Sequence, residues 1–192
     1  MGVCIVGAAL MFSLAGMSIK MASASLSNET IVFWRNALSL VILAPWAVVQ
    51  RRRWFRRDNM PLIVARALIV LASLYCYYYA VAAIPLADAV LLNFSSPIFV
   101  PLLGLLIFGF ALNRSVVLAV LIGFLGVSLV LQPGPGVVEP AALIGLLGGV
   151  LGGLAVVVLW RMPSGEHPGR IAFFFALIGV ALSAIPVLVS RA

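Results

Sequence analysis

The stretch "VAAIPLADAVLLNFSSPIFVPLLG" (residues 81–104) connects two long apolar segments through a very short polar turn. An α-helix of about 20 apolar residues crosses the hydrocarbon core of a bilayer. The segments on either side of "AIPLAD" (83–88) are long enough for this, so they predict two antiparallel membrane-spanning helices joined as a hairpin. The second segment also contains an amide, two serine hydroxyls and two prolines, which a purely lipid-facing helix would not need.

Composition supports a membrane protein over a soluble one. The chain has 192 residues, of which 65% are hydrophobic and 9% are charged. About a quarter of the residues in soluble domains are charged. This chain has too few charged residues to cover a water-facing surface. The net charge of +7 does not indicate nucleic-acid binding, because five of the twelve basic residues lie in one run, "RRRWFRR" (51–57). We expect the loop Arg51–Arg57 to be cytoplasmic and to contact anionic lipid headgroups.

The sequence predicts no catalytic residues, no cofactor and no metal site. Cys4 and Cys76 lie in apolar stretches without the spacing of a disulfide or metal-binding motif, and His167 is the single histidine. An intramembrane enzyme would need a Ser/His or His–metal arrangement, and none can be recognised. We therefore expect a protein that is not an enzyme.

Seven apolar stretches are long enough to span a membrane, at about residues 2–20, 29–50, 61–83, 86–109, 115–132, 141–160 and 171–190. Basic loop residues are enriched on the cytoplasmic side of membrane proteins. A cytoplasmic N-terminus places eight of them inside, namely Arg51, Arg52, Arg53, Arg56, Arg57, Arg114, Arg161 and Arg170, and only Lys20 and Arg191 outside. We expect a multi-pass protein of the cytoplasmic (cell) membrane with its N-terminus in the cytoplasm.

An internal repeat is visible at an offset of 141 residues. Residues 5–21 align without gaps with residues 146–162, and Lys20 then meets Arg161. The offset contains five predicted spans, an odd number, so the second copy would be inverted relative to the first. Inverted repeats are an architecture of secondary transporters.

These observations predict two units. Residues 1–132 would form a first five-helix repeat, and residues 141–192 would be the start of a second, inverted repeat. Two full copies would need ten spans, so the second copy is expected to be incomplete. The predicted fold class is therefore an all-α polytopic membrane protein with seven transmembrane helices.

The chain resembles the EamA-type repeat of the drug/metabolite transporter superfamily. The resemblance is carried by Arg66 at the start of the third span, "AIPLADAVLL" (83–92), "SSPIFVPLLG" (95–104), "GFLGVSLVLQPG" (123–134) and "FWRNALSL" (33–40). It implies a ten-helix fold of two inverted five-helix repeats that moves small metabolites, often outward, across the cytoplasmic membrane.

One stretch departs from that pattern. Members commonly carry a "GEKL"-like sequence after the fourth span, whereas this chain has "GFAL" with Phe110 and Ala111 at those positions. Two functions therefore stay open: a secondary transporter, expected to export small polar metabolites, or a truncated or degenerate paralogue that does not transport.

The polar residues of the fourth span are the first candidates for a substrate pathway. Proline lacks a backbone N–H, so Pro97 leaves the carbonyl of Asn93 without its helical partner. Asn93 and Pro97 share one face, and Ser96 adjoins it. Unsatisfied backbone is costly in lipid, so this face should contact protein or a water-filled cavity. It either lines a substrate path or forms a structural kink.

Further candidates lie in the second and third spans. Arg35, with Ser39 on the same face, could attract a carboxylate or phosphate, or could instead extend to the outer headgroups. Tyr75, Tyr78 and Tyr79 follow helical spacing and could contact a substrate, or could pack or form an interfacial belt.

Glycines of the sixth span are predicted to serve helix packing. Gly145, Gly149 and Gly153 recur every four residues, a pattern that allows close approach of another helix. The partner could be another span of the same chain or a second copy in a homodimer.

Overall fold

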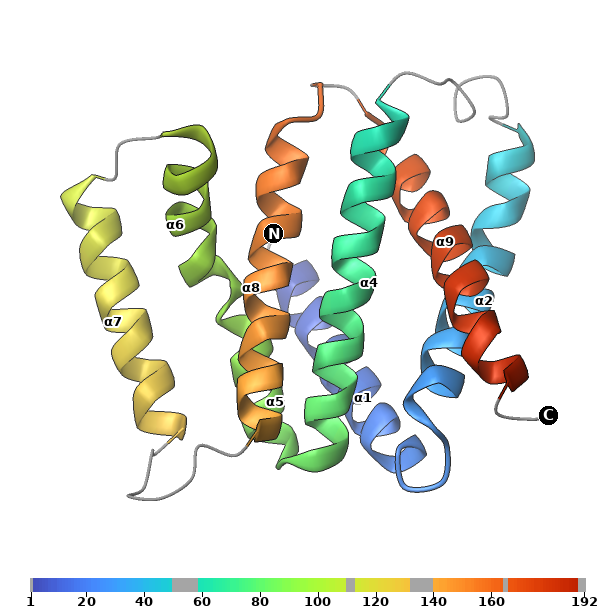
Figure 1. Cartoon of the computed structure of the whole chain (residues 1–192), viewed down its shortest axis with the longest axis horizontal. Helices are drawn as coiled ribbons and strands as arrows, with labels where there is room; N and C mark the ends of the chain where they lie inside the picture. The colour runs from blue at the N-terminus through green and yellow to red at the C-terminus, as the bar shows by residue number, and fades with distance from the viewer. Residues whose placement is uncertain (1, 50–58, 110–112, 132–139, 164–165, 190–192) are drawn as a thin grey trace.

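The described part of the chain is helical, with no strand. The structure, a computed structural model, describes residues 2–49, 59–109, 113–131, 140–163 and 166–189. Each predicted span contains helix (Figure 1), with these bounds: α1 (Gly2–Ala22), α2 (Asn28–Val49), α4 (Met60–Ala83), α5 (Leu86–Phe94), α6 (Ser96–Phe108), α7 (Arg114–Leu131), α8 (Pro140–Trp160) and α9 (Pro168–Val189). The prediction of an all-α polytopic membrane protein is confirmed.

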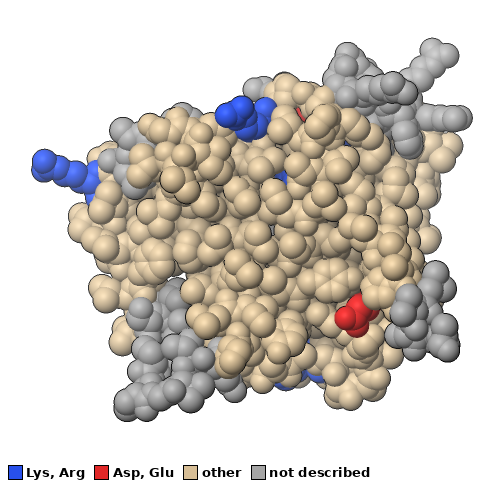
Figure 2. Space-filling view, in the orientation of Figure 1, with Lys and Arg blue, Asp and Glu red and all other residues tan. Residues whose placement is uncertain are grey.

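Length and surface both fit a bilayer. Within the described residues, five segments are long and apolar enough to cross it: Asn28–Val49, Met60–Ala83, Leu86–Phe108, Pro140–Trp160 and Pro168–Pro186. Large apolar side chains such as Leu106, Val49 and Ile42 are exposed on the bundle surface. In Figure 2 the middle of the visible face is almost free of charge, and most charged side chains lie towards its upper and lower edges. An exposed apolar surface of this kind suits contact with lipid.

The helices after residue 140 pack among those that precede it. α8 lies between α4 and α6, and α9 lies against α2 (Figure 1). Two apolar clusters each contain residues from before and after position 140. One joins Ala141 and Ala142 of α8 to residues of α2, α4 and α5, and the other joins Phe173 and Phe174 of α9 to Ala47 and Ile63. The two predicted repeats therefore share one core, and the division of the chain into repeats stays a prediction.

α8 approaches its neighbours closely because its interface is made of glycine. A Cβ at Gly145 would lie 3.1 Å from the Cβ of Ala80, and one at Gly153 would lie 3.0 Å from the carbonyl oxygen of Ser96. At Gly149 a Cβ would come within 2.7 Å of the carbonyl oxygen of Leu92. No side chain fits there without moving the backbone of the neighbouring helix. The structure thus places all three predicted packing glycines against α4, α5 or α6.

The fourth predicted span is interrupted at Ser95, where α5 ends and α6 begins. Pro97 falls in the first turn of α6, where its missing N–H removes no helical bond. Backbone bonds at the break are short-range: Ser95 N donates to Leu92 O at 3.2 Å and Ile98 N donates to Ser95 O at 2.9 Å. The buried Ser95 hydroxyl also donates to Leu92 O, at 2.6 Å. The polar segment is therefore a break in the helix, held against the glycine face of α8.

A single lysine fastens the end of α1 to the hairpin between α4 and α5. The Lys20 ammonium donates to the carbonyl oxygens of Val81 at 2.6 Å, Ala82 at 3.2 Å and Ile84 at 3.0 Å. These carbonyls lie at the C-terminus of α4, where helices leave acceptors unsatisfied and favour a positive charge. This contact keeps α1 across the outer part of the hairpin.

Candidate functional site

A cavity of about 170 Å³ lies between α1, α2, α4 and α5. Its lining combines aliphatic and aromatic side chains with a guanidinium, an amide and three hydroxyls. The lining residues are Phe12, Ala15, Gly16 and Ile19 of α1, Arg35 of α2, Val70, Ser73, Leu74, Tyr77 and Tyr78 of α4, and Asn93 of α5. It is the one place in the described residues where several predicted pathway residues meet.

One face of α4 forms the largest part of the wall. Val70, Ser73, Leu74, Tyr77 and Tyr78 follow the spacing i, i+3, i+4, i+7, i+8, which places them along one side of a helix. This face holds the serine and tyrosine hydroxyls, and Ser73, Tyr77 and Tyr78 are buried in the bundle. The cavity is therefore a gap in helix packing along a continuous stripe of α4.

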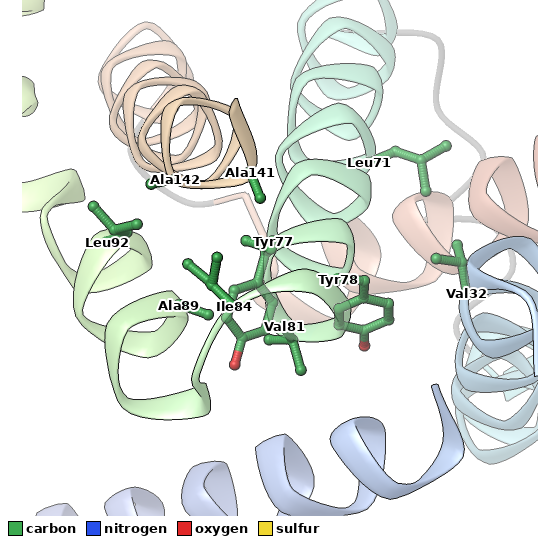
Figure 3. Packing of buried hydrophobic residues seen from close by; sticks show 11 residues of the cluster. Val32, Leu71, Tyr77, Tyr78, Val81, Ile84, Ala89, Leu92, Ala141 and Ala142 are labelled. Atoms are coloured by element: carbon green, nitrogen blue, oxygen red, sulfur yellow. The ribbon is translucent and has the colours of Figure 1, made fainter. Parts of the chain in front are cut away.

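The two tyrosines bring hydroxyls that have no partner. Tyr77 is 5% exposed and Tyr78 is 2% exposed, yet neither hydroxyl makes a hydrogen bond with any described residue. Figure 3 shows both side chains on the part of α4 that faces α1. A buried hydroxyl without a partner costs about 1–3 kcal/mol. Each hydroxyl would gain a hydrogen bond if a ligand or a water molecule displaced the atoms that cover it.

α1 closes the cavity with a small residue and an aromatic ring. A Cβ on Gly16 would lie 3.5 Å from the Tyr77 hydroxyl, an ordinary van der Waals contact, so α1 packs directly beside this hydroxyl. The Phe12 ring lies 6.3 Å from that of Tyr77 and 5.2 Å from that of Phe94, measured between centroids. α1 thus helps to bury the tyrosines, including their hydroxyls, without giving those hydroxyls a hydrogen-bond partner.

The cationic group of the cavity comes from α2. Arg35 lies seven residues after the start of α2 at Asn28, or about 10 Å along the helix. Its guanidinium carbon is 5.9 Å from the centre of the Phe175 ring of α9, a distance that permits a cation–π interaction. No carboxylate pairs with Arg35 among the described residues. The charge is thus oriented by an aromatic ring and left without a counter-ion.

Asn93 completes the polar wall two residues before the helix break at Ser95. It lies seven residues after the start of α5 at Leu86, again about 10 Å along the helix. Tyr78 lies five residues before the end of α4 at Ala83, and this end meets the start of α5. The amide, the hydroxyls and the guanidinium therefore lie at similar depth. Ser73 contributes less, because its hydroxyl already donates to Gly148 O at 2.7 Å.

The structure divides the residues predicted for the substrate pathway. Asn93, Arg35 and Tyr78 line the cavity. Ser96 faces α8 instead, with its Cβ 3.4 Å from the position of a Cβ on Gly152, and Pro97 is exposed.

The other predicted pathway residues also lie outside the cavity lining. Ser39 donates to Arg35 O at 2.9 Å. The carbonyl of Tyr75 accepts a bond from the Asn28 amide at 3.3 Å. Tyr79 is 47% exposed on the bundle surface.

Two cavity residues of α4 were missed from the sequence. Tyr77 does not belong to the Tyr75, Tyr78 and Tyr79 pattern, but consecutive residues are only about 100° apart on a helix, so Tyr77 and Tyr78 can line the same wall. Ser73 was not considered. The apolar and aromatic stripe that begins at Val70 is the signal that could have found both.

The chemistry of this site is that of binding. It offers hydrogen-bond donors, one cation and ring faces, and the described lining holds no acid, thiol or imidazole. Within the described residues no cluster of His, Cys, Asp or Glu could hold a metal ion. The bundle defines a polytopic membrane protein, and the cavity, with its mixed apolar and polar lining, is its candidate binding site.

Sequence comparison identifies the family. Residues 1–132 match the EamA-like transporter family, and the chain belongs to this family. It is 32% identical over 182 residues to proteins named pseudopaline exporter CntI from two strains of Pseudomonas aeruginosa, UCBPP-PA14 and PAO1. This similarity covers 94% of the chain and 63% of each relative, so the chain spans less than two thirds of their length.

A more distant relative is named riboflavin transporter, from Brucella anthropi. It is 28% identical over 103 residues, which cover 54% of this chain and 36% of the relative. No solved structure gives a significant match.

Proposed function

We propose that this chain belongs to a secondary transporter that exports small polar metabolites across the cytoplasmic membrane, without enzymatic activity. The observation that carries the proposal is the cavity, which is lined by Arg35, Asn93, Tyr77 and Tyr78, and both tyrosine hydroxyls are buried without a partner among the described residues. The two buried hydroxyls are costly unless they meet a ligand or water. Membership of the family and the names of the relatives support the same function.

The helix break strengthens the proposal. In secondary transporters, substrate sites are often formed where spans are discontinuous. Asn93 lies next to the break at Ser95, so a small change in the angle between α5 and α6 would move its amide relative to α4. The cavity wall can thereby change shape without unfolding either helical segment.

The proposed orientation has a cytoplasmic N-terminus. One end of the bundle holds three arginines: Arg114 at the start of α7, Arg161 just after α8 and Arg170 in the first turn of α9. Lys20 lies at the other end, in the last turn of α1. Positively charged loops face the cytoplasm. Arg51–Arg57 lies outside the described residues, and its contact with anionic lipid is part of this proposal.

Orientation is testable by thiol labelling in intact cells. With the native cysteines replaced, Arg53→Cys should resist a membrane-impermeant thiol reagent, and Gly136→Cys should react. The opposite labelling pattern would reverse the proposed topology.

The transport proposal is tested with the purified chain in liposomes. We expect release of at least one radiolabelled compound from a panel of amino acids, organic acids, nucleosides and sugars, at a rate above that of protein-free liposomes. Asn93→Ala should reduce this release. A folded chain that releases none of them would favour the alternative, a non-transporting paralogue.

A further inference from the structure

We infer that the cavity selects small organic monocarboxylates that have an apolar body. This inference rests on the proposed function, because it assigns a substrate class to the same cavity. It follows from the charge, the hydrogen-bonding groups and the apolar surfaces of the lining.

The charge of the lining sets the sign of the ligand. Arg35 is the one charged residue in the described wall, and it has no carboxylate partner. Arg35 is exposed, so its guanidinium is accessible, and an anion bound beside it would form a charge-assisted pair. A dianion such as a phosphate monoester would bring a second charge that no group in the wall can balance.

The shape of the cationic group favours a carboxylate. Guanidinium presents parallel N–H groups that match the two oxygens of a carboxylate, and such charge-assisted pairs are about twice as strong as neutral hydrogen bonds. Phe175 holds the Arg35 guanidinium from the α9 side, so less side-chain entropy is lost on binding. The hydroxyls of Tyr77 and Tyr78 and the amide of Asn93 add neutral donors within the same cavity.

The rest of the wall favours an apolar body. Ile19, Val70 and Leu74 contribute aliphatic surface, and Phe12 and Tyr77 contribute rings. The volume of about 170 Å³ is below that of sites for drug-sized ligands, which measure about 300–1,000 Å³. A small acid with an aromatic or branched aliphatic group fits this combination of size and surface.

The experiment compares two probes of the same shape, benzoate and benzamide. Binding of each to the purified full chain in detergent is measured by equilibrium dialysis at neutral pH. Benzoate should bind about tenfold or more tightly than benzamide, because it alone can form the charge-assisted pair.

Arg35→Gln should abolish this preference. We expect benzoate affinity to fall about tenfold or more, while benzamide affinity changes by less than about threefold. Arg35→Lys keeps the charge and should retain part of the preference. Arg114→Gln removes an exposed arginine at the start of α7, distant from the cavity lining, and should bind both probes as the native chain does.

The outcomes separate this inference from the proposed function. Equal binding of benzoate and benzamide to the native chain would refute the carboxylate class and leave a general transport cavity standing. A native chain that binds neither probe, but releases another compound from liposomes, would also refute the class. If Arg35→Gln fails to fold, the native comparison and Arg35→Lys still decide.

Discussion

The hairpin of α4 and α5 has two sides that are built in opposite ways. On one side α8 packs so closely that a Cβ on Gly148 would lie 3.1 Å from the Cβ of Cys76, and one on Gly149 would meet the backbone of Leu92. On the other side, towards α1 and α2, a cavity remains and two buried tyrosine hydroxyls find no partner. The same pair of helices therefore has one face that is filled and one that is left open.

This difference assigns separate tasks to the two faces. Close packing of small residues is a main source of stability between helices in a bilayer, where no hydrophobic force brings them together. An open polar face contributes no such contacts and leaves donors unsatisfied. The α8 side should therefore control whether the bundle assembles, and the cavity side should control what it binds.

The largest effect is expected from a substitution on the packed side. Gly149→Leu would place a side chain where even a Cβ lies 2.7 Å from Leu92 O and from the Ser95 hydroxyl. Overpacking against backbone should destabilise the bundle by about 3 kcal/mol or more. We expect loss of the monodisperse protein in size-exclusion chromatography.

Gly7→Leu is the matched control, because a Cβ at Gly7 meets nothing within 4 Å. This variant should elute as the native chain does. Normal yield and thermal stability of Gly149→Leu would show that the α8 interface is not tightly packed.

A smaller effect is expected where α1 is fastened to the hairpin. Lys20→Met removes three hydrogen bonds to the C-terminus of α4 and should lower stability by about 1–2 kcal/mol. Lys20→Arg keeps the charge and the donors and should lose less. The thermal midpoint in detergent measures both. Equal midpoints for Lys20→Met and the native chain would mean that the lysine cap contributes no stability.

The smallest effect on stability, and one of opposite sign, is expected on the cavity side. Tyr78→Phe removes a buried hydroxyl that has no partner among the described residues. The free energy of unfolding should therefore stay unchanged or rise by up to about 1 kcal/mol, and the thermal midpoint should follow it. Transport or ligand affinity should fall, since the ligand loses a donor. A clear drop in thermal stability would instead indicate that this hydroxyl is bonded in the native bundle.

Much of the fold could be predicted because bilayer thickness limits the possible structures. Long apolar segments, basic loops and the turn at 83–88 were enough to place the spans. The polar stretch at 93–101 indicated that the fourth span is special, and the helix is interrupted at Ser95. The end of each helix was harder to place, because capping and turns depend on local contacts.

The site was less predictable because a cavity is a property of several helices together. Arg35, Tyr78 and Asn93 were recognised as polar groups inside spans, whereas Tyr77 and Gly16 acquire their role only from the approach of α1 to α4. Lys20 was recognised only as a topological marker and as a position of the internal repeat, because the backbone carbonyls that it contacts lie 61 to 64 residues away. Sequence spacing within one helix contains no information on such contacts.

The central claim, that Asn93 of the fourth span lines a cavity that water can enter, is tested most directly by thiol accessibility in membranes. Asn93→Cys and Leu106→Cys are prepared in a chain with Cys4→Ala and Cys76→Ala, and each is treated with a charged methanethiosulfonate reagent in membrane vesicles. Leu106 is 81% exposed on the bundle surface, whereas Asn93 is half-buried. Water reaches a cavity but not the lipid face, so Asn93→Cys should react and Leu106→Cys should not. Faster labelling at position 106, or no labelling at position 93, would contradict the account.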